Sequence, residues 1–454
     1  MEASDQVERS QSALRRAISS KMLFFFVLGD ILGAGIYALV GEVGAEVGGA
    51  IWTAFLLALV LAVFTAFAYA ELVTKYPQAA GAALYVNKAF RLPFLTFLVA
   101  FAVMASGLTS AATLSTAFAG DYLQEFLDVP STLAALVFLV AVSLINVRGI
   151  SESVKVNIVL TTIEVGGLIL ICVIAAAAIG DAAPGVDTAR AFQFKEGEAA
   201  ALAILSGAAL AFYALIGFED SVNVAEETRD PRHAYPRALF GALAAAGAVY
   251  LMVTILASMT VPTDRLSGSS GSLLEVVRVG PLAIEPRIFS AIALFAIANG
   301  ALLNLIMASR LTYGMSREGI VPAVFARVLP GWRTPIVAIV FTAGLCALLI
   351  VIGDLSTLAD STVTLLLSVF ILVNISVLVL RRDKVTRDHF RAPSFLPVIG
   401  AIVCVVLLTR QEAETFAFAG GLMLLGVVLY VISRRFTGPT GMDTQKLQAV
   451  QRPD

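Results

Sequence analysis

Charged residues are scarce in this sequence. Only 14% of its 454 residues are Asp, Glu, Lys or Arg, whereas 59% are hydrophobic. Soluble domains contain about 25% charged and about 45–50% apolar residues, so the composition excludes an ordinary soluble domain. The net charge is −2 and no array of basic residues is present, which argues against a nucleic-acid partner. The composition indicates a chain whose main partner is the lipid bilayer.

Cysteine and histidine are scarcer still. Cys172, Cys346 and Cys404 all lie in apolar stretches without the spacing of a metal site, and His233 and His389 lie in polar stretches. A membrane hydrolase would need histidine, paired aspartates or serine with histidine at membrane depth, and neither histidine is placed there. No GxxxxGK[ST] phosphate loop occurs either. The sequence therefore predicts no enzyme, no ATP drive, and neither a cofactor nor a metal.

Long apolar segments are abundant. A helix needs roughly 20 mostly apolar residues to cross a bilayer. Many segments meet this condition, and we predict twelve spans, with ends that the pattern leaves approximate. The predicted spans are residues 22–44, 50–73, 93–118, 131–147, 157–179, 201–223, 237–261, 287–311, 334–352, 360–380, 395–410 and 414–433. The predicted fold class is thus an all-α membrane protein with twelve transmembrane helices.

Basic residues are distributed unevenly between the loops that these spans define. All but six of the 31 Lys and Arg residues fall on the side of the N-terminus; the exceptions are Arg190, Lys195, Arg265, Arg278, Arg287 and Arg410. Because Lys and Arg collect in short cytoplasmic loops, both termini are predicted in the cytoplasm. We expect a multi-pass protein of the cell membrane, with cytoplasmic tails at 1–20 and 436–454 and a membrane domain at 21–435.

The first span carries features that weaken a helix. Its segment VLGDILGAGIYALVG (27–41) holds four glycines and Asp30 within an apolar run. Lipid offers no hydrogen-bond partners, so unwound backbone is tolerated only inside protein or beside a watery cavity. Gly33-Ala34-Gly35 is a candidate unwinding point. Small residues at this place also permit close packing of two helices, which is the alternative explanation.

A second weakened span favours unwinding. The sixth span and the segment after it, FYALIGFEDSVNVAEETRDP (212–231), carry Gly217, Glu219 and Asp220. Spans one and six are five apart, and interrupted helices at corresponding positions of two halves are typical of an inverted-repeat transporter. The two halves share no visible sequence identity, so this symmetry rests on position only.

Two interrupted helices would offer complementary ends to a small zwitterion. A break exposes free N–H groups at one new helix end and free C=O groups at the other. The N–H end favours an anion such as a carboxylate, whereas carbonyl oxygens favour an ammonium group. We therefore expect backbone amides near residues 33–35 to hold the carboxylate of an amino acid and carbonyls near residues 213–217 to hold its amine.

Four collinear segments resemble one known family. They are LGAGIYALVGEV (32–43), YAELVTKYPQAAGAALYV (69–86), FYALIGFEDSVNVAEETRDPRHAYPRAL (212–239) and ASRLTYGMSREGIVPAVFARV (308–328). Together they resemble the amino acid–polyamine–organocation permeases, and especially the cationic amino acid transporters and their bacterial relatives. The resemblance covers about residues 20–435. One departure is Asp30, which stands where relatives usually have a small or neutral polar residue.

The resemblance implies a fold and a site. The implied fold is a leucine-transporter-like five-plus-five inverted repeat, with the first repeat at about 21–180, the second at about 200–380, and two further helices at about 395–433. Helices 1 and 6 would be broken. The implied substrate-binding residues are Ile31, Gly33, Ala34, Gly35, Tyr213, Ala214, Ile216 and Gly217. Tyr213 would cover the substrate as a gate, or would be an ordinary packed aromatic residue.

Ionisable residues inside the spans are functional candidates, because each costs about 2.5–3.5 kcal/mol or more at the bilayer centre. Glu164 lies well inside the fifth span, and a carboxyl group in apolar surroundings holds its proton more tightly. We expect Glu164 to carry the coupled proton, or else to be a structural residue of the bundle.

The other polar residues of the spans have different expected roles. Asp30 is a candidate substrate contact or gate, or a helix-terminus residue. Glu219 is interpreted as a gating or network residue and Asp220 as its solvated or paired neighbour. Asn299 and Asn304 are expected to bond between helices.

The predicted function is secondary active transport of amino acids by alternating access, coupled to protons. Exchange of amino acids or amines, and polyamine import, are alternatives within the same class. A channel or a non-transporting sensor is a further class that the sequence leaves open. It leaves open as well which amino acid or amine is the substrate, and the oligomeric state.

Overall fold

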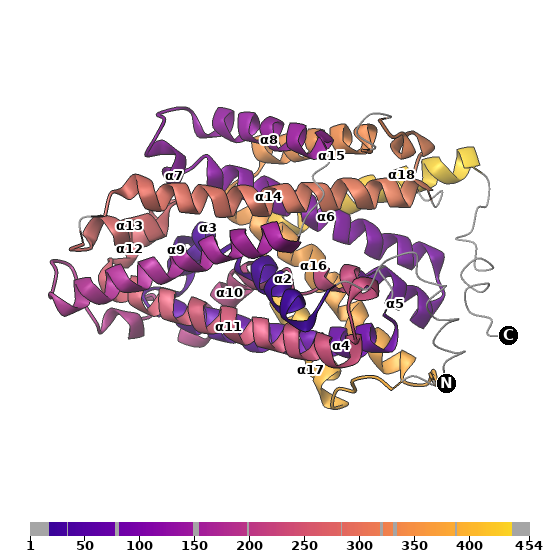
Figure 1. The fold of residues 1–454 in the computed structure, drawn as a ribbon, viewed down its shortest axis with the longest axis horizontal. Helices are drawn as coiled ribbons and strands as arrows, with labels where there is room; N and C mark the ends of the chain where they lie inside the picture. Colours follow the sequence, from indigo (N-terminus) through magenta and orange to yellow (C-terminus); the bar gives the residue numbers. More distant parts are fainter. Residues whose placement is uncertain are drawn as a thin grey trace.

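Helices make up nearly all the regular structure of this protein. The computed structural model describes residues 18–33, 35–77, 81–148, 154–197, 199–282, 284–317, 321–329, 334–385 and 388–437. In this part of the chain there is no strand, only two isolated bridges that join Ile18 to Thr228 and Gly48 to Phe194. The long helices lie side by side along the longest axis of the molecule (Figure 1). An all-helical fold is therefore confirmed.

The helices follow the apolar segments of the sequence. They are α2 (Ser20–Leu32), α3 (Gly35–Val47), α4 (Ile51–Lys75), α5 (Gly81–Phe90), α6 (Pro93–Phe118), α7 (Asp121–Gln124), α8 (Ser131–Arg148), α9 (Val154–Gly180), α10 (Ala200–Ala211), α11 (Pro231–Thr260), α12 (Thr263–Ser267), α13 (Ser272–Val279), α14 (Pro286–Arg317), α15 (Ile336–Ile352), α16 (Leu355–Leu380), α17 (Phe395–Leu408) and α18 (Ala413–Thr437). Four 3-10 helices accompany them: η1 (Arg190–Phe192), η2 (Phe212–Leu215), η3 (Asp220–Glu227) and η4 (Ala323–Ala326).

Nine helical segments of the described chain are long and apolar enough to cross a membrane. The pair α2 and α3, bent by 41° relative to each other, would make a tenth span. Helices α15 and α17 are apolar but shorter, with 17 and 14 residues. Large apolar side chains cover the outside of the bundle: Val137, Leu144, Phe295 and Leu424 are each more than 60% exposed. Such a surface is stable against lipid, so the protein is a multi-pass membrane protein, and the count of twelve spans stays a prediction.

Both weakened spans depart from regular α-helix. Helix α2 ends at Leu32 and α3 begins at Gly35. Helix α10 ends at Ala211, and the chain continues through η2 and η3 instead of completing an α-helical span. These interior segments are enclosed by longer helices: α2 packs against α9 and α11, and α10 packs against α3 and α4. The surrounding helices thus shield from lipid the backbone that the breaks leave without regular helical hydrogen bonds.

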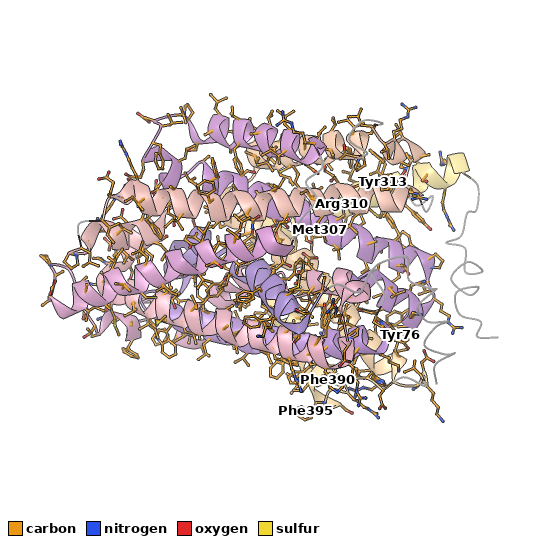
Figure 2. The ribbon with its side chains drawn as sticks, viewed as in Figure 1. Tyr76, Met307, Arg310, Tyr313, Phe390 and Phe395 are labelled. Atoms are coloured by element: carbon orange, nitrogen blue, oxygen red, sulfur yellow. The ribbon has the colours of Figure 1, made fainter. Side chains whose placement is uncertain are left out.

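A buried ion pair lies near one end of the bundle. The Arg381 guanidinium donates to both carboxyl oxygens of Glu71, at 2.9 and 2.6 Å, and Glu71 is 1% exposed. Nearby, the Tyr76 hydroxyl donates to an Asp383 carboxyl oxygen at 2.6 Å. Figure 2 shows the labelled Tyr76 and Phe390 at this same end. The network joins the end of α4 to the chain that follows α16.

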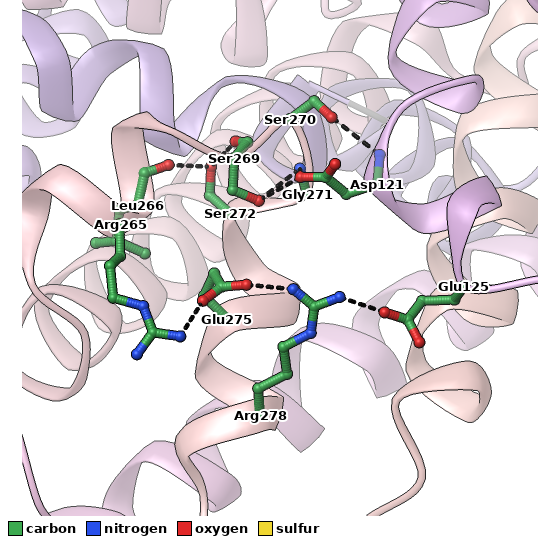
Figure 3. Close-up of polar contacts among 10 residues, drawn as sticks. All are labelled: Asp121, Glu125, Arg265, Leu266, Ser269, Ser270, Gly271, Ser272, Glu275 and Arg278. Atoms are coloured by element: carbon green, nitrogen blue, oxygen red, sulfur yellow. Dashed lines mark hydrogen bonds and ion pairs between the residues drawn. The ribbon is translucent and has the colours of Figure 1, made fainter. Parts of the chain in front are cut away.

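A second polar network lies at the opposite end of the bundle, on the segment between α11 and α14 that contains α12 and α13. The Arg278 guanidinium lies between two carboxyl groups: it donates to Glu275 at 2.5 Å and forms an ion pair with Glu125 (Figure 3). Arg265 forms a second ion pair with Glu275 at 2.6 Å. This segment packs closely against α3: a Cβ at Gly41 of α3 would lie 2.2 Å from the carbonyl oxygen of Leu266 in α12.

Candidate functional site

A small cavity lies where the two interrupted segments meet. Its volume is about 60 Å³, enough for a few water molecules, since one water needs at least roughly 10–15 Å³ of such space. The first break, the second break, α6 and α14 all contribute to its wall. The lining residues are Gly29, Asp30, Ile31, Gly33, Gly35, Ser110, Leu114, Tyr213, Ala214, Ile216, Gly217, Asp220, Asn299, Gly300, Leu303 and Asn304. All the described residues that the sequence singled out as substrate-binding are in this set; Ala34 lies outside the described residues.

Glycine lets the two breaks touch. A Cβ at Gly35 would lie 2.7 Å from the Cα of Ala214, closer than two carbon atoms can approach without displacement. Gly35 is the first residue of α3 and Ala214 belongs to η2. The unwound parts of the first and sixth predicted spans are therefore in direct backbone contact beside the cavity.

A second glycine fixes the geometry of the sixth span. Gly217 has a φ of +120°, a conformation that L residues with a side chain rarely adopt. A Cβ there would also lie 2.7 Å from the carbonyl oxygen of Asp30. The Gly217 N–H donates to a carboxyl oxygen of Glu219 at 2.9 Å. Glycine is thus required at this position both by backbone conformation and by space.

The carbonyl groups of the second break already have some partners. Tyr213 O accepts from the Ile216 amide at 3.3 Å, and Gly217 O accepts from the Asp220 amide at 3.1 Å. The oxygen of Ala214 lies 3.1 Å from the Tyr250 hydroxyl. A carbonyl oxygen has two lone pairs, so each of these groups retains capacity for one further donor.

Tyr213 is held at the cavity wall by α6. Its hydroxyl and the Ser110 hydroxyl are 3.0 Å apart, and the two residues are only 6% and 8% exposed. The ring therefore borders the cavity while its polar atom is satisfied. This arrangement agrees with both roles considered for Tyr213 from the sequence, because a ring held in this way can cover a substrate or simply pack against its neighbours.

Two asparagines of α14 complete the polar wall. Asn299 and Asn304 both line the cavity. The Asn304 amide donates to the carbonyl oxygen of Gly300 in its own helix at 2.9 Å, and the expected bond from Asn304 to another helix stays a prediction. Both residues were passed over as site candidates, and the only available signal was polarity within an otherwise apolar span.

Glu164 lies behind this wall. Its side chain is buried, with 1% of the residue exposed, and neither carboxyl oxygen makes a hydrogen bond within the described chain. Asn299 approaches it without the geometry of a hydrogen bond. Asn299 therefore stands between the cavity, which it lines, and the carboxyl group of Glu164.

The other acidic candidates differ in whether they line the cavity. Asp30 and Asp220 line the cavity, so Asp220 is more than a neighbour of Glu219. Glu219 is 6% exposed and does not line it; its carboxyl group instead accepts from the Gly217 amide two residues before it. The sequence also offers Glu226 and Glu227, which precede Arg229 and Arg232, as candidates for an inner-gate salt-bridge cluster. The side chains of Glu226 and Glu227 lie outside the described residues.

An all-helical membrane protein with a polar cavity between two interrupted helices has the architecture expected of a permease. The family model "Amino acid permease" matches residues 18–434. The chain therefore belongs to the amino acid permease family, which makes it a transporter rather than an enzyme.

Curated relatives carry different substrate names. The Branched-chain amino acid permease BcaP of Bacillus subtilis (strain 168) is 24% identical over 449 residues, which cover 94% of each chain. The Low-affinity putrescine importer PlaP of Escherichia coli (strain K12) is 27% identical, covering 88% of this chain and 89% of the importer. Cationic amino acid transporter 4 of Mus musculus is 28% identical, covering 82% of this chain and 61% of the mouse protein.

Proposed function

We propose that this protein is a secondary active transporter that moves amino acids across the membrane by alternating access. The observation that carries the proposal is the cavity between the breaks. Gly33 and Gly35 line it on one side, and the other side is lined by Tyr213, Ala214, Ile216 and Gly217. Family membership supports the substrate class. No chemistry is performed on the substrate.

The substrate is bound by backbone groups of both breaks. The first turn of α3 begins at Gly35 and carries N–H groups without helical partners, which attract a carboxylate. Carbonyl oxygens of residues 213–217 accept hydrogen bonds from the ammonium group. Ile31, Gly33, Ala34, Gly35, Tyr213, Ala214, Ile216 and Gly217 form the site, and Tyr213 covers it.

The proposal includes a topology. Twelve spans form two inverted five-helix repeats, of about 21–180 and 200–380, in the manner of the leucine transporter, followed by two helices. Both termini lie in the cytoplasm, where most of the Lys and Arg residues fall. The bundle that contains the two interrupted spans rocks against the other helices around the bound substrate.

A proton drives the transport. Glu164 carries it, since its carboxyl group is buried close to the cavity and has no hydrogen-bond partner in the described chain. Asp30 acts at the substrate site or its inner gate, because it lines the cavity and touches Gly217. Glu219 positions the second break through its hydrogen bond to the Gly217 amide.

Import or exchange of amines is a second candidate function. Two acidic residues, Asp30 and Asp220, line the cavity, and Lys, Arg and His are absent among its described lining residues. A positively charged substrate would be attracted to such a wall. The printed name of PlaP, a putrescine importer, points to the same chemistry for a relative.

Counterflow in proteoliposomes tests both candidates. Vesicles loaded in turn with each of the twenty amino acids or putrescine are given a trace of the same labelled compound outside. A transporter accumulates label transiently, whereas a channel does not. We expect accumulation with one or more amino acids; accumulation with putrescine alone would favour the amine permease, and none with any compound would contradict both.

A matched pair of glycine variants ties the activity to the cavity. Gly217→Ala should abolish counterflow, because the new methyl group meets Asp30 and φ is +120°. Gly185→Ala is the control: its φ is +90°, so the backbone strain is comparable, but a Cβ there meets no atom within 4 Å. Equal loss in both variants would show that strain alone, not the site, explains the effect.

A further inference from the structure

One tyrosine outside the cavity contacts both breaks. The Tyr250 hydroxyl oxygen lies 2.7 Å from the carbonyl oxygen of Ile31, 3.1 Å from that of Leu32 and 3.1 Å from that of Ala214. Ile31 and Leu32 are the last two residues of α2, and Ala214 belongs to η2. Tyr250 itself is on α11, is 1% exposed and is not part of the cavity wall.

The hydroxyl group has one proton for three acceptors. Carbonyl groups at a helix end have lost their helical donors and need other donors inside a membrane bundle. Three carbonyl oxygens that converge on one point repel one another unless a donor lies among them, and at this point the donor is the phenol. Its proton is shared between the last carbonyl groups of α2 and the carbonyl group of Ala214 in η2.

We propose that Tyr250 is a positioning residue that sets the relative placement of the two breaks and so the shape of the substrate site. This inference rests on the proposed function. The α3 amides and the carbonyl groups of residues 213–217 belong to separate segments. The distance between these segments must match the separation of the carboxylate and the ammonium group in one small molecule. The Tyr250 hydroxyl is bonded to both segments, and it reaches them from a helix that packs along α2, α4 and α9.

The ring and the hydroxyl have separate tasks. The ring packs edge-to-face on Phe55, with centroids 5.8 Å apart and an interplanar angle of 76°. Tyr250→Phe keeps this packing and removes only the shared donor. Tyr85→Phe is the matched control, because Tyr85 is also fully buried but its hydroxyl has no hydrogen-bond partner among the described residues.

Uptake kinetics in proteoliposomes separate positioning from mere stability. The probes are labelled L-leucine, L-arginine and putrescine, each at a series of concentrations. For a probe that the wild type transports, Tyr250→Phe should raise KM about 2- to 12-fold, the loss of one hydrogen bond, with Vmax changed less than KM. Tyr85→Phe should leave KM unchanged. An unchanged KM in Tyr250→Phe, or a variant that does not fold, would overturn the proposal, because the hydroxyl would then serve stability only.

Amide hydrogen exchange gives a readout that needs no substrate. Tyr250→Phe should speed exchange in residues 29–37 and 212–218 together, and Tyr85→Phe in neither. Faster exchange in only one segment, or in neither, would overturn the proposal. If the wild type takes up none of the probes, the proposed function fails for them, while the exchange result still decides whether Tyr250 holds the two breaks together.

Discussion

The Tyr37 hydroxyl donates a hydrogen bond of 2.8 Å to the main-chain carbonyl oxygen of Glu164. Tyr37 lies on α3, just after the first break, and Glu164 lies on α9. Gly167, three residues further on, leaves room for this contact, since a Cβ there would lie 2.7 Å from the Tyr37 hydroxyl. We therefore expect a movement of α3 on substrate binding to displace the α9 backbone at Glu164, the proposed proton site.

Removing this hydroxyl should loosen the coupling between substrate and proton. We expect Tyr37→Phe to transport substrate with a smaller ratio of uptake at external pH 5.5 to uptake at pH 7.5 than the wild type has. The buried hydrogen bond contributes about 0.5–1.5 kcal/mol, so the variant should still fold. A ratio equal to that of the wild type, with Tyr85→Phe as control, would show that the contact is structural only.

Replacing the carboxyl group itself should remove the pH dependence. Glu164→Gln keeps the size of the side chain but cannot exchange a proton, so its uptake should be equal at external pH 5.5 and 7.5. Glu164→Asp is the control, since it retains a titrating carboxyl group and should keep a pH dependence at a lower rate. Wild-type pH dependence that survives in Glu164→Gln would rule out Glu164 as the proton carrier.

The contact between the breaks should tolerate no side chain. Gly35→Ala places a methyl group 2.7 Å from the Cα of Ala214, which should separate the two segments and lower counterflow at least about tenfold, an effect of about 1.4 kcal/mol. Gly166→Ala is the control, because a Cβ at this helical glycine meets nothing within 4 Å. Counterflow that Gly35→Ala leaves intact would mean that the breaks do not need to touch.

Asp354 should stabilise the start of α16. Its carboxyl group accepts from the Thr357 amide at 2.7 Å and from the Ser356 hydroxyl at 3.0 Å. Burial alone would raise the pKa of Asp354, but these hydrogen bonds outweigh burial and lower it. Asp354→Ala should cost about 1 kcal/mol, a fall in Tm of no more than about 2–4 °C.

The sign of the pH effect follows from the lowered pKa of Asp354. The stabilisation is complete above the pKa of an unfolded Asp, about 4, and is lost as the pH falls through the lower pKa of the folded state. The Tm difference between wild type and Asp354→Ala in detergent should therefore shrink below about pH 4. Asp354→Asn, which keeps an accepting oxygen, should be milder at neutral pH; if it is as damaging as alanine, the cap is not the cause.

The apolar segments and the two interruptions could be predicted from the sequence. Length and hydropathy determine where a membrane helix lies. Within the second interruption, Gly217 has a φ of +120°, a conformation that glycine adopts readily. The ends of helices and the short helix α5 were less predictable, because polar residues there fit several structures. Local signals therefore predicted the apolar helices and the two interruptions, whereas the count of twelve spans stays a prediction.

The opposite wall of the cavity could not be predicted. Ser110 lies on α6 and Asn304 on α14, and both are far from the two breaks in the sequence. The spacing of apolar residues within one helix does not indicate which distant helix that helix will pack against. Asp220 was interpreted as a solvated or paired neighbour of Glu219, and its place in the cavity wall was not foreseen. Tyr250 gave no signal at all, since a tyrosine within an apolar span is ordinary until the carbonyl groups around it are seen.

The most direct test of the central claim is an experimental structure of the protein with the substrate that counterflow identifies. The account predicts density for the ligand between residues 33–35 and residues 213–217, with its carboxylate at the first amides of α3 and its amine at the carbonyl groups of the second break. Ligand density elsewhere in the bundle, with this cavity filled by side chains, would contradict it.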